Sequence, residues 1–304
     1  MSARVLAVAL VLFWSSGFIG AELGSSSTDA ATVLAWRCLV PALLLAPLLP
    51  RRWRRWPARE WGRQVVLAVL CQGLYLAGIY WGAAAGVPAG TSALIGSLQT
   101  ALVLVAVAVA NRRPVSRRHV AGLAAGTAGV ALTAVGDVGA GASLLALLLP
   151  VAAVLSLAAG TVLHERWGAG STPTMPLAQS LALQCSVAAV LTSGAAAATG
   201  DLLPPPSAGF WVALAFAVVA GLGSYACYYR AIDVLGADRT NALLYLTPAV
   251  TAVWAAAVFG DDLRVTTVLG LALSGAGAAL LLQLGSLRPE VRRAPVAPPP
   301  DGLR

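Results

Sequence analysis

The chain has 304 residues, of which 59% are apolar and only 11% charged, with a formal net charge of +8 at pH 7. Soluble domains carry about 25% charged residues, and a soluble protein could not keep so much apolar surface from water. The composition excludes an ordinary soluble domain and predicts a protein embedded in a lipid bilayer. All twenty basic residues are arginine, mostly in short loops, so they indicate membrane topology and no nucleic-acid partner is expected.

Ten apolar runs follow one another, each near the roughly 20 residues that a helix needs to cross a bilayer. They cover residues 3–22, 30–49, 64–85, 89–110, 119–136, 143–163, 175–199, 208–230, 239–259 and 265–284. The first is interpreted as an uncleaved span because comparable runs follow it. The sequence predicts an all-α membrane protein with ten transmembrane helices. Its tail, residues 287–304, is rich in proline and charge and is expected to be disordered.

The arginines alternate between the two ends of these helices. Eighteen of the twenty fall at the N-terminus, in the loops after the second, fourth and sixth runs, around the end of the eighth run, or in the tail. Only Arg264 falls on the opposite side, and Arg37 lies inside the second run. Because positive residues remain in the cytoplasm, we expect both termini, including the tail, to be cytoplasmic and the protein to lie in the inner cell membrane.

The second half of the chain repeats the first. The segment TSALIGSLQTALVLVAVAVAN from Thr91 aligns with TNALLYLTPAVTAVWAAAVFG from Thr240. Five helices make an odd number, so a second five-helix unit enters the membrane from the opposite side. We predict two inverted five-helix repeats, residues 1–138 and 139–286, around a central site. This architecture is typical of secondary transporters.

Small residues recur on the fifth and tenth predicted helices. The two sets align with each other and are Gly122, Gly126 and Gly129, and Gly270, Ser274 and Gly277. Small residues four apart let helix backbones approach closely within a bilayer. The pattern suits a contact between the two halves or between the protomers of a homodimer, and the sequence leaves both open.

Arg37 is the charged residue that lies deepest in a predicted span, about two turns from the outer end of the second helix. A charge there is costly unless it faces water, a partner or a substrate. One interpretation is an anchor for an anionic group such as a carboxylate. The other is structural: Arg37 would extend outward or pair with Glu22 at the outer end of the first helix.

Other polar and aromatic residues within the spans extend this candidate site, since polar groups in hydrocarbon need partners and face the bundle interior. The candidate substrate-binding residues are Trp14, Arg37, Gln72, Tyr75, Gln99, Gln179, Tyr225, Asn241 and Tyr245. Pro248, expected a third of the way into the ninth helix, is interpreted as a structural kink that lines the site. Tyr80 and Trp81 are left out because they suit the outer interfacial belt.

The remaining reactive residues form no catalytic or metal-binding pattern. The four cysteines lie inside apolar runs, where they suit a packed core, and no Cys/His spacing suits a metal. We therefore expect no cofactor and no enzyme activity, and we expect a small-molecule substrate. A membrane-integral enzyme or a lipid-handling protein is the alternative.

The chain resembles the EamA-type transporters of the drug/metabolite transporter superfamily over about residues 3–285. The matching pieces are LFWSSGFIGAELG, LAWRCLVPALLL, TNALLYLTP and the two glycine-patterned helices. Members typically carry an acidic and then a basic residue after the fourth and ninth helices, where this chain has Asn111-Arg112 and Asp261-Asp262. The resemblance implies ten spans in two inverted repeats and transport, commonly export, of amino acids or related small polar metabolites.

Overall fold

The computed structural model describes residues 2–49, 56–110, 117–139, 143–168, 175–235, 240 and 243–285. These parts of the chain are almost wholly helical and contain no strand. Helices suit a lipid solvent because each one pairs its backbone N–H and C=O groups within a single segment. The predicted all-α class is therefore confirmed.

The first half of the chain contains α1 to α6. Its elements are α1 (Ala3–Ser27), α2 (Ala30–Leu45), the 3-10 helix η1 (Ala46–Leu48), α3 (Ala58–Leu67), the π-helix η3 (Ala68–Leu74), α4 (Tyr75–Ala84), α5 (Ala89–Ala110) and α6 (Arg117–Gly139). The Asp29 carboxylate caps α2 by accepting a hydrogen bond from the N–H of Ala31 at 2.8 Å. Such caps satisfy N–H groups that lack a partner in the helix. α3, η3 and α4 follow one another without a break.

The second half has the same mostly uninterrupted helical character. Its elements are α7 (Leu144–Gly168), α8 (Leu177–Thr199), α9 (Ala208–Leu235), α11 (Thr247–Phe259) and α12 (Val265–Gly285). α8 and α11 end at Gly200 and Gly260, whose φ angles are 85° and 75°. Glycine adopts this left-handed conformation without steric cost, so both helices stop cleanly.

Within the residues that the structure describes, six helical segments are long and apolar enough to cross a membrane. They are Ala3–Ser27, Ala30–Leu48, Ala58–Ala84, Leu144–His164, Leu177–Thr199 and Ala208–Tyr228. Shorter apolar helices lie at Ala89–Val103, Val120–Gly136, Thr247–Phe259 and Val265–Gly277. Apolar side chains such as Leu145 and Val190 are 75% and 73% exposed, as expected where a helix faces lipid. The chain is therefore a multi-pass membrane protein.

The third predicted helix begins earlier than expected. We predicted residues 64–85, but α3 starts at Ala58, so Arg59 and Arg63 belong to the helix and not to the preceding loop. Polar contacts at helical spacing stabilise these extra turns. Glu60 pairs with Arg63 at 3.5 Å and accepts a hydrogen bond from Gln64 at 2.9 Å.

The ninth predicted helix is interrupted by a turn, and this corrects the interpretation of Pro248. We placed Pro248 a third of the way into a helix over residues 239–259, as a kink. Residues 243–244 are helical, residues 245–246 form a turn, and α11 begins at Thr247, so the span is interrupted and Pro248 lies in the first turn after the interruption. The absent N–H of proline costs nothing there, and its fixed φ favours helix initiation.

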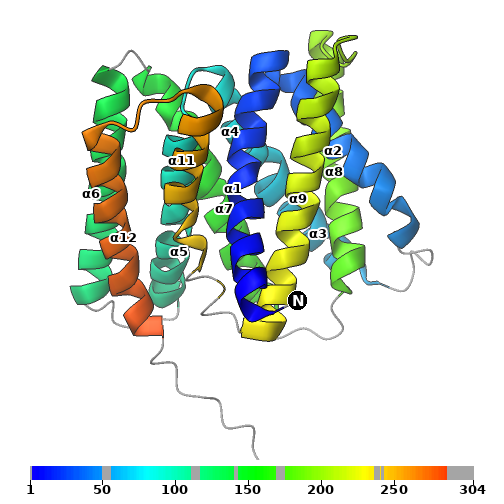
Figure 1. Ribbon diagram of the computed structural model, residues 1–304. Coiled ribbons are helices and arrows are strands. Elements are labelled where there is room, and N and C mark those ends of the chain that lie inside the picture. Colours follow the sequence, from blue (N-terminus) through cyan, green and yellow to red (C-terminus); the bar gives the residue numbers. More distant parts are fainter. Residues whose placement is uncertain are drawn as a thin grey trace, which may run out of the picture.

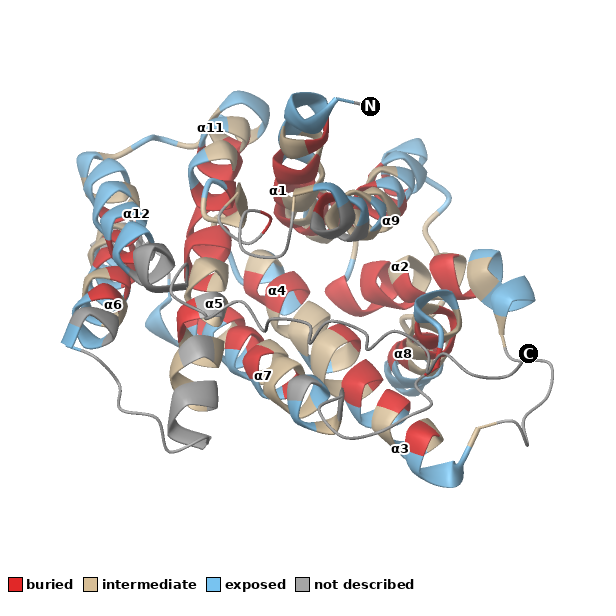
Figure 2. Cartoon of the chain, turned by 90° about the horizontal axis from the view of Figure 1, so that it is seen from below, coloured by how far each residue is buried: buried red, intermediate tan, exposed pale blue. Residues whose placement is uncertain are grey.

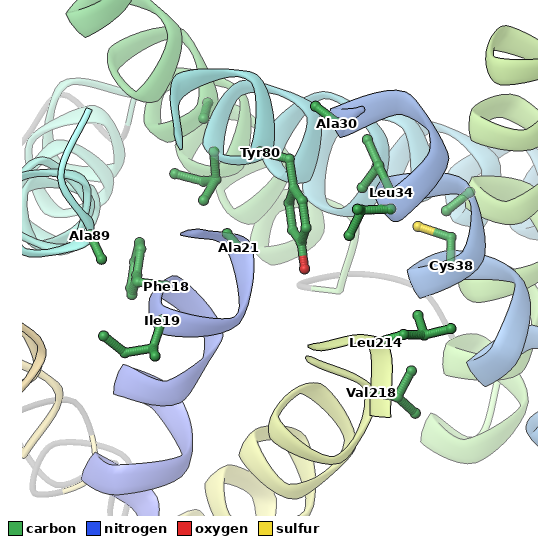
Figure 3. Close-up of a cluster of buried hydrophobic side chains, with 14 of the residues drawn as sticks. Phe18, Ile19, Ala21, Ala30, Leu34, Cys38, Tyr80, Ala89, Leu214 and Val218 are labelled. Carbon is green, nitrogen blue, oxygen red and sulfur yellow. The ribbon is translucent and has the colours of Figure 1, made fainter. Parts of the chain in front are cut away.

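Helices from the two halves of the chain pack against each other. α1 packs along α9, α2 along α8, the segment from α3 to α4 along α7, α5 along α11, and α6 along α12. The pair of α6 and α12 stands at one end of the molecule (Figures 1 and 2), and α3 lies toward the other. The largest hydrophobic cluster lies between these ends and includes Phe18, Leu34, Tyr80 and Leu214 (Figure 3).

The glycine pattern serves the contact between α6 and α12. A Cβ atom added at Gly129 would lie 2.5 Å from the Gly270 carbonyl oxygen and 2.8 Å from the Ser274 nitrogen. The Ser274 hydroxyl donates to the Gly126 carbonyl at 3.1 Å across the same contact. Of the two alternatives for these residues, the structure uses the contact between the halves of one chain.

Candidate functional site

A cavity of about 80 Å³ lies among α1, α2, η3, α4 and α9, roughly midway along α1 and α9. Its lining residues are Trp14, Gly17, Phe18, Arg37, Cys71, Gln72, Tyr75, Leu76, Ile79, Tyr80, Gly221, Ser224 and Tyr225. One water molecule needs about 10–15 Å³ by a comparable measure, so the space holds several waters or a small solute. A smaller cavity adjoins it, and both are lined by Arg37, Gln72, Gly221 and Tyr225.

Arg37 projects from α2 toward α9. A Cβ atom added at Gly221 of α9 would lie 2.8 Å from the Nη2 atom of Arg37, so the absence of a side chain at Gly221 makes room for the guanidinium. The ionisable groups nearest to it are the phenols of Tyr80 and Tyr225 and the thiols of Cys38 and Cys185. Phenols and thiols are ordinarily neutral at neutral pH, so Arg37 brings an uncompensated positive charge to the cavity.

Of the structural alternatives for Arg37, pairing with Glu22 is not observed. Glu22 and Arg37 form no ion pair, although the structure describes both residues. The Glu22 carboxylate accepts a hydrogen bond from the N–H of Ala89 at 2.7 Å, at the first residue of α5. A carboxylate is favoured there because helix N-terminal N–H groups lack partners.

A proline inside α2 borders the site. Pro41 lies inside the helix, one turn after Arg37, and lines the smaller cavity. Proline has no N–H, so it cannot bond to the carbonyl of the residue four positions earlier, which is Arg37. The interior proline that borders the site is therefore Pro41, within the LAWRCLVPALLL segment, and not Pro248.

The π-helix η3 presents Gln72 to the cavity. Its Nε2 donates to the Tyr225 hydroxyl of α9 at 3.4 Å. A π-helical turn disturbs the regular ladder of backbone bonds, and it often marks a functional site. Here the Ser156 hydroxyl of α7 donates to the Leu70 carbonyl at 2.8 Å and so satisfies part of that turn.

Aromatic rings form much of the remaining wall. Trp14 packs on Tyr228 with ring centroids 5.4 Å apart, which holds the Trp14 ring in place at the edge of the cavity. Tyr75 lies at the start of α4 and lines the same space. The cavity therefore combines one cation with carboxamide, phenol and apolar ring surface.

The structure brings together Trp14, Arg37, Gln72, Tyr75 and Tyr225 of the predicted residues. Gln99, Gln179 and Tyr245 are described but do not line this cavity; Gln99 instead donates to the Thr161 hydroxyl of α7 at 3.2 Å. Asn241 lies outside the described residues. We had grouped Gln99 with the site because it aligns with the second repeat, and that alignment does not specify which way a side chain faces.

Sequence reasoning missed several lining residues. Tyr80 was assigned to the interfacial belt, but it is only 1% exposed and lies next to the Arg37 guanidinium. Figure 3 shows its ring between α1 and α2. Ser224, also at the cavity, donates to the Phe13 carbonyl at 2.7 Å and ties α9 to α1. Both are polar groups inside apolar runs, and that was the available signal.

A second polar cluster lies between α3, α7 and α8. Gln184 of α8 donates to Gln64 at 2.8 Å, Gln64 donates to Glu60, and Arg63 lies 5.7 Å from the ring centre of Trp167 on α7. Gln64 precedes the lining residue Gln72 by two helical turns, or about 12 Å at 1.5 Å per residue. The cluster is on the side of the cavity where α1 begins and α9 ends (Figure 1). We call this side the arginine-rich end.

The helices and the cavity together define a multi-pass membrane protein with a solute-sized cavity that contains one arginine. The chain belongs to the EamA-like transporter family, whose model matches residues 1–135 and 144–283. It is thus a membrane transporter of the drug/metabolite superfamily, and the members of this family are transporters and not enzymes.

Structural comparison agrees with this fold. One solved crystal structure is 17% identical, aligns over 94% of this chain and 98% of its own, and has a TM-score of 0.62. At that identity the similarity concerns the fold alone. No protein of curated function matches the chain.

Proposed function

We propose that the protein is a secondary transporter that exports a small polar metabolite, such as an amino acid or a related compound, by alternating access. The proposal rests on Arg37. This cation lines a cavity inside a membrane protein, and no carboxylate is paired with it in the described parts of the chain. A charge at the centre of a membrane helix costs about 2.5–3.5 kcal/mol on insertion scales, so its retention favours a role with a substrate.

The packing supports two inverted five-helix repeats around the cavity. If α1 to α6 and α7 to α12 each form five spans in the same order, α2 and α8, α5 and α11, and α6 and α12 are equivalent pairs, and each pair packs together. α1 packs on α9, and the equivalent contact is that of α7 with the segment from α3 to α4, which also forms. A twofold axis between two similar halves produces this pattern, which suits exchange between two states.

The arginine distribution supports an orientation in which both termini are cytoplasmic, with the protein in the inner cell membrane. In that orientation the Gln184–Gln64–Glu60 cluster lies between the cavity and the cytoplasm. Opening toward the cytoplasm would separate α3 from α8, and opening toward the other side would keep them together. This cluster is therefore the contact that we expect to break and re-form in each transport cycle.

Reconstitution into liposomes tests the proposal. Wild-type protein should move radiolabelled solutes from a metabolite panel, and Arg37→Ala should reduce the transport of carboxylates most. Hydrogen bonds to charged groups contribute about 1.5–3 kcal/mol, which corresponds to roughly a 10- to 150-fold loss. Arg37→Lys should recover part of it by keeping the charge.

Arg59→Ala is the matched control, because Arg59 is exposed at the start of α3 and its loss removes the same charge. Its transport should equal that of wild type. If no solute of the panel moves, or if Arg37→Ala transports carboxylates like Arg59→Ala, the proposed function is wrong.

A further inference from the structure

The charge inventory of the cavity is one-sided. Of its described lining residues, Arg37 is the only one with a formal charge at neutral pH, and the others are aromatic, aliphatic, amide, hydroxyl, thiol or glycine. The recognition chemistry present is therefore a single cation with neutral surroundings.

The described carboxylates near these helices are engaged elsewhere. Glu22 binds the N–H of Ala89, Asp29 caps α2 at Ala31, and Glu60 binds Gln64 and Arg63 at the arginine-rich end. None of the three lines the cavity. The described site thus offers an anion a partner of opposite charge, and offers a cation none.

We propose that the cavity selects a small monoanionic carboxylate with an apolar or aromatic remainder over the zwitterion of the same skeleton. Within the proposed substrate class it favours the related carboxylates over the amino acids themselves, and its use in transport rests on that proposed function. An organic acid without an ammonium group is then the preferred ligand, and the corresponding α-amino acid is the poorer one.

An α-ammonium group would be placed badly in this site. It is attached to the carbon next to its carboxylate, so a carboxylate bound at Arg37 brings the ammonium close to the guanidinium, where like charges repel strongly in a medium of low dielectric constant. The Gln72 amide and the Ser224 hydroxyl, which line the cavity, are neutral acceptors. They can accept hydrogen bonds, but they do not compensate a second positive charge.

The rest of the cavity suits an apolar remainder. Phe18, Leu76 and Ile79 supply apolar surface, and Trp14 supplies a ring fixed by its packing on Tyr228. Burying a ring against such surface is favourable, and it needs no polar partner. A ligand with its carboxylate at Arg37 and its ring against these apolar residues would contact both the charged and the apolar part of the lining.

Three compounds that share a phenylethyl skeleton test the selectivity. 3-Phenylpropanoate carries only the carboxylate, phenethylamine carries only the amine, and L-phenylalanine carries both. Their affinities for the full-length protein in lipid nanodiscs are measured by calorimetry at neutral pH. We expect 3-phenylpropanoate to bind at least ten-fold more tightly than L-phenylalanine, which is about 1.4 kcal/mol, and phenethylamine to bind most weakly. Equal or tighter binding of L-phenylalanine, or no binding of 3-phenylpropanoate, overturns the proposal.

Two variants identify the cause of the preference. Arg37→Gln should remove the ten-fold preference, and Arg37→Lys should keep part of it, while the exposed-charge control Arg59→Gln should keep all of it. The Arg37→Gln variant must first elute as a folded, monodisperse protein. If that variant keeps the full preference for 3-phenylpropanoate, the assignment to Arg37 is overturned. If 3-phenylpropanoate is preferred but no solute moves in liposomes, the proposed function fails and the binding selectivity stands. If solutes move but L-phenylalanine binds more tightly, the selectivity fails and the proposed function stands.

Discussion

Helices of the two halves meet both at the pair of α6 and α12 and around the cavity. Glycine serves a different purpose in each of these two regions. At α6 and α12, glycine lets one backbone approach another: a Cβ at Gly129 would lie 2.5 Å from the Gly270 carbonyl. At the cavity, glycine makes room for a side chain: a Cβ at Gly221 would lie 2.8 Å from Arg37 Nη2. The first contact brings backbone against backbone, and the second borders the cavity.

Because of this difference, the two regions should contribute to different properties of the protein: stability at α6 and α12, and ligand binding at the cavity. A clash against backbone can be relieved only by moving a helix, whereas a clash against the end of a long flexible side chain is relieved by moving that side chain. Changes at α6 and α12 should therefore alter the stability of the protein. Changes of equal size at the cavity should alter affinity and leave stability nearly as it is.

The largest expected effect is that of Gly129→Ala on α6. The added methyl group meets Gly270 and Ser274 backbone atoms, and overpacking of this kind costs about 1–3 kcal/mol. Thermal unfolding of the purified protein should occur at a clearly lower temperature. Gly275→Ala on α12 is the control, because a Cβ there has no atom within 4 Å. Equal midpoints for the two variants would contradict the comparison.

Gly221→Ala should have the next largest effect, and on a different property. The methyl group displaces the Arg37 guanidinium, so we expect about ten-fold weaker carboxylate binding, or 1.4 kcal/mol, with little change in the unfolding temperature. Gly209→Ala on the same helix has open space around its Cβ and should match wild type in both. A Gly221→Ala protein that is destabilised as much as Gly129→Ala would show that the two regions do not differ.

Gln184→Leu should weaken the contact between α3 and α8 at the arginine-rich end. Losing the 2.8 Å bond to Gln64 removes about 1 kcal/mol, which raises the population open at that end roughly five-fold. Cys71, which lines the cavity, should then react faster with a water-soluble maleimide added from that end, as measured by peptide mass spectrometry. Ser186→Ala, which loses only a bond to Ala182 within α8, should leave the rate unchanged, and an equal rate in Gln184→Leu would disprove this role.

The smallest effect is expected for Ser274→Ala. It removes the hydrogen bond to the Gly126 carbonyl but keeps the close backbone contact, and such bonds contribute about 0.6 kcal/mol on average within membranes. The unfolding temperature should fall slightly, and far less than in Gly129→Ala. A fall of similar size would mean that the hydroxyl, and not the small side-chain volume, holds α6 against α12.

Much of the fold could be read from the sequence, because lipid leaves the chain few choices. An apolar run of the required length must form a helix to satisfy its backbone, so the positions of the helices follow from composition alone. The local errors arose where polar contacts or turn chemistry decided a boundary. Glu60 and Arg63 extend α3 toward its N-terminus, before the apolar run begins. The turn at residues 245–246 makes Pro248 an initiating residue of α11.

The site was only partly predictable. Arg37, Gln72 and Tyr225 attract attention as polar or aromatic groups in apolar runs, and all three border the cavity. Gln99 carries the same signal but contacts Thr161, and Tyr80 was set aside although it lies beside Arg37. Polarity in a span shows that a side chain needs a partner, and it does not show which partner it finds.

Apolar length, the repeat and the position of an arginine can all be read along the chain, so they were enough to identify a membrane protein with a repeated helical unit and a charge inside one span. Only the tertiary structure decided that the glycines of α6 meet those of α12, that Glu22 caps α5, and that Arg37 lies against Gly221. These contacts join residues far apart in the chain, so they depend on how helices cross. Helix crossing is set by the packing of all the helices together and not by any one segment.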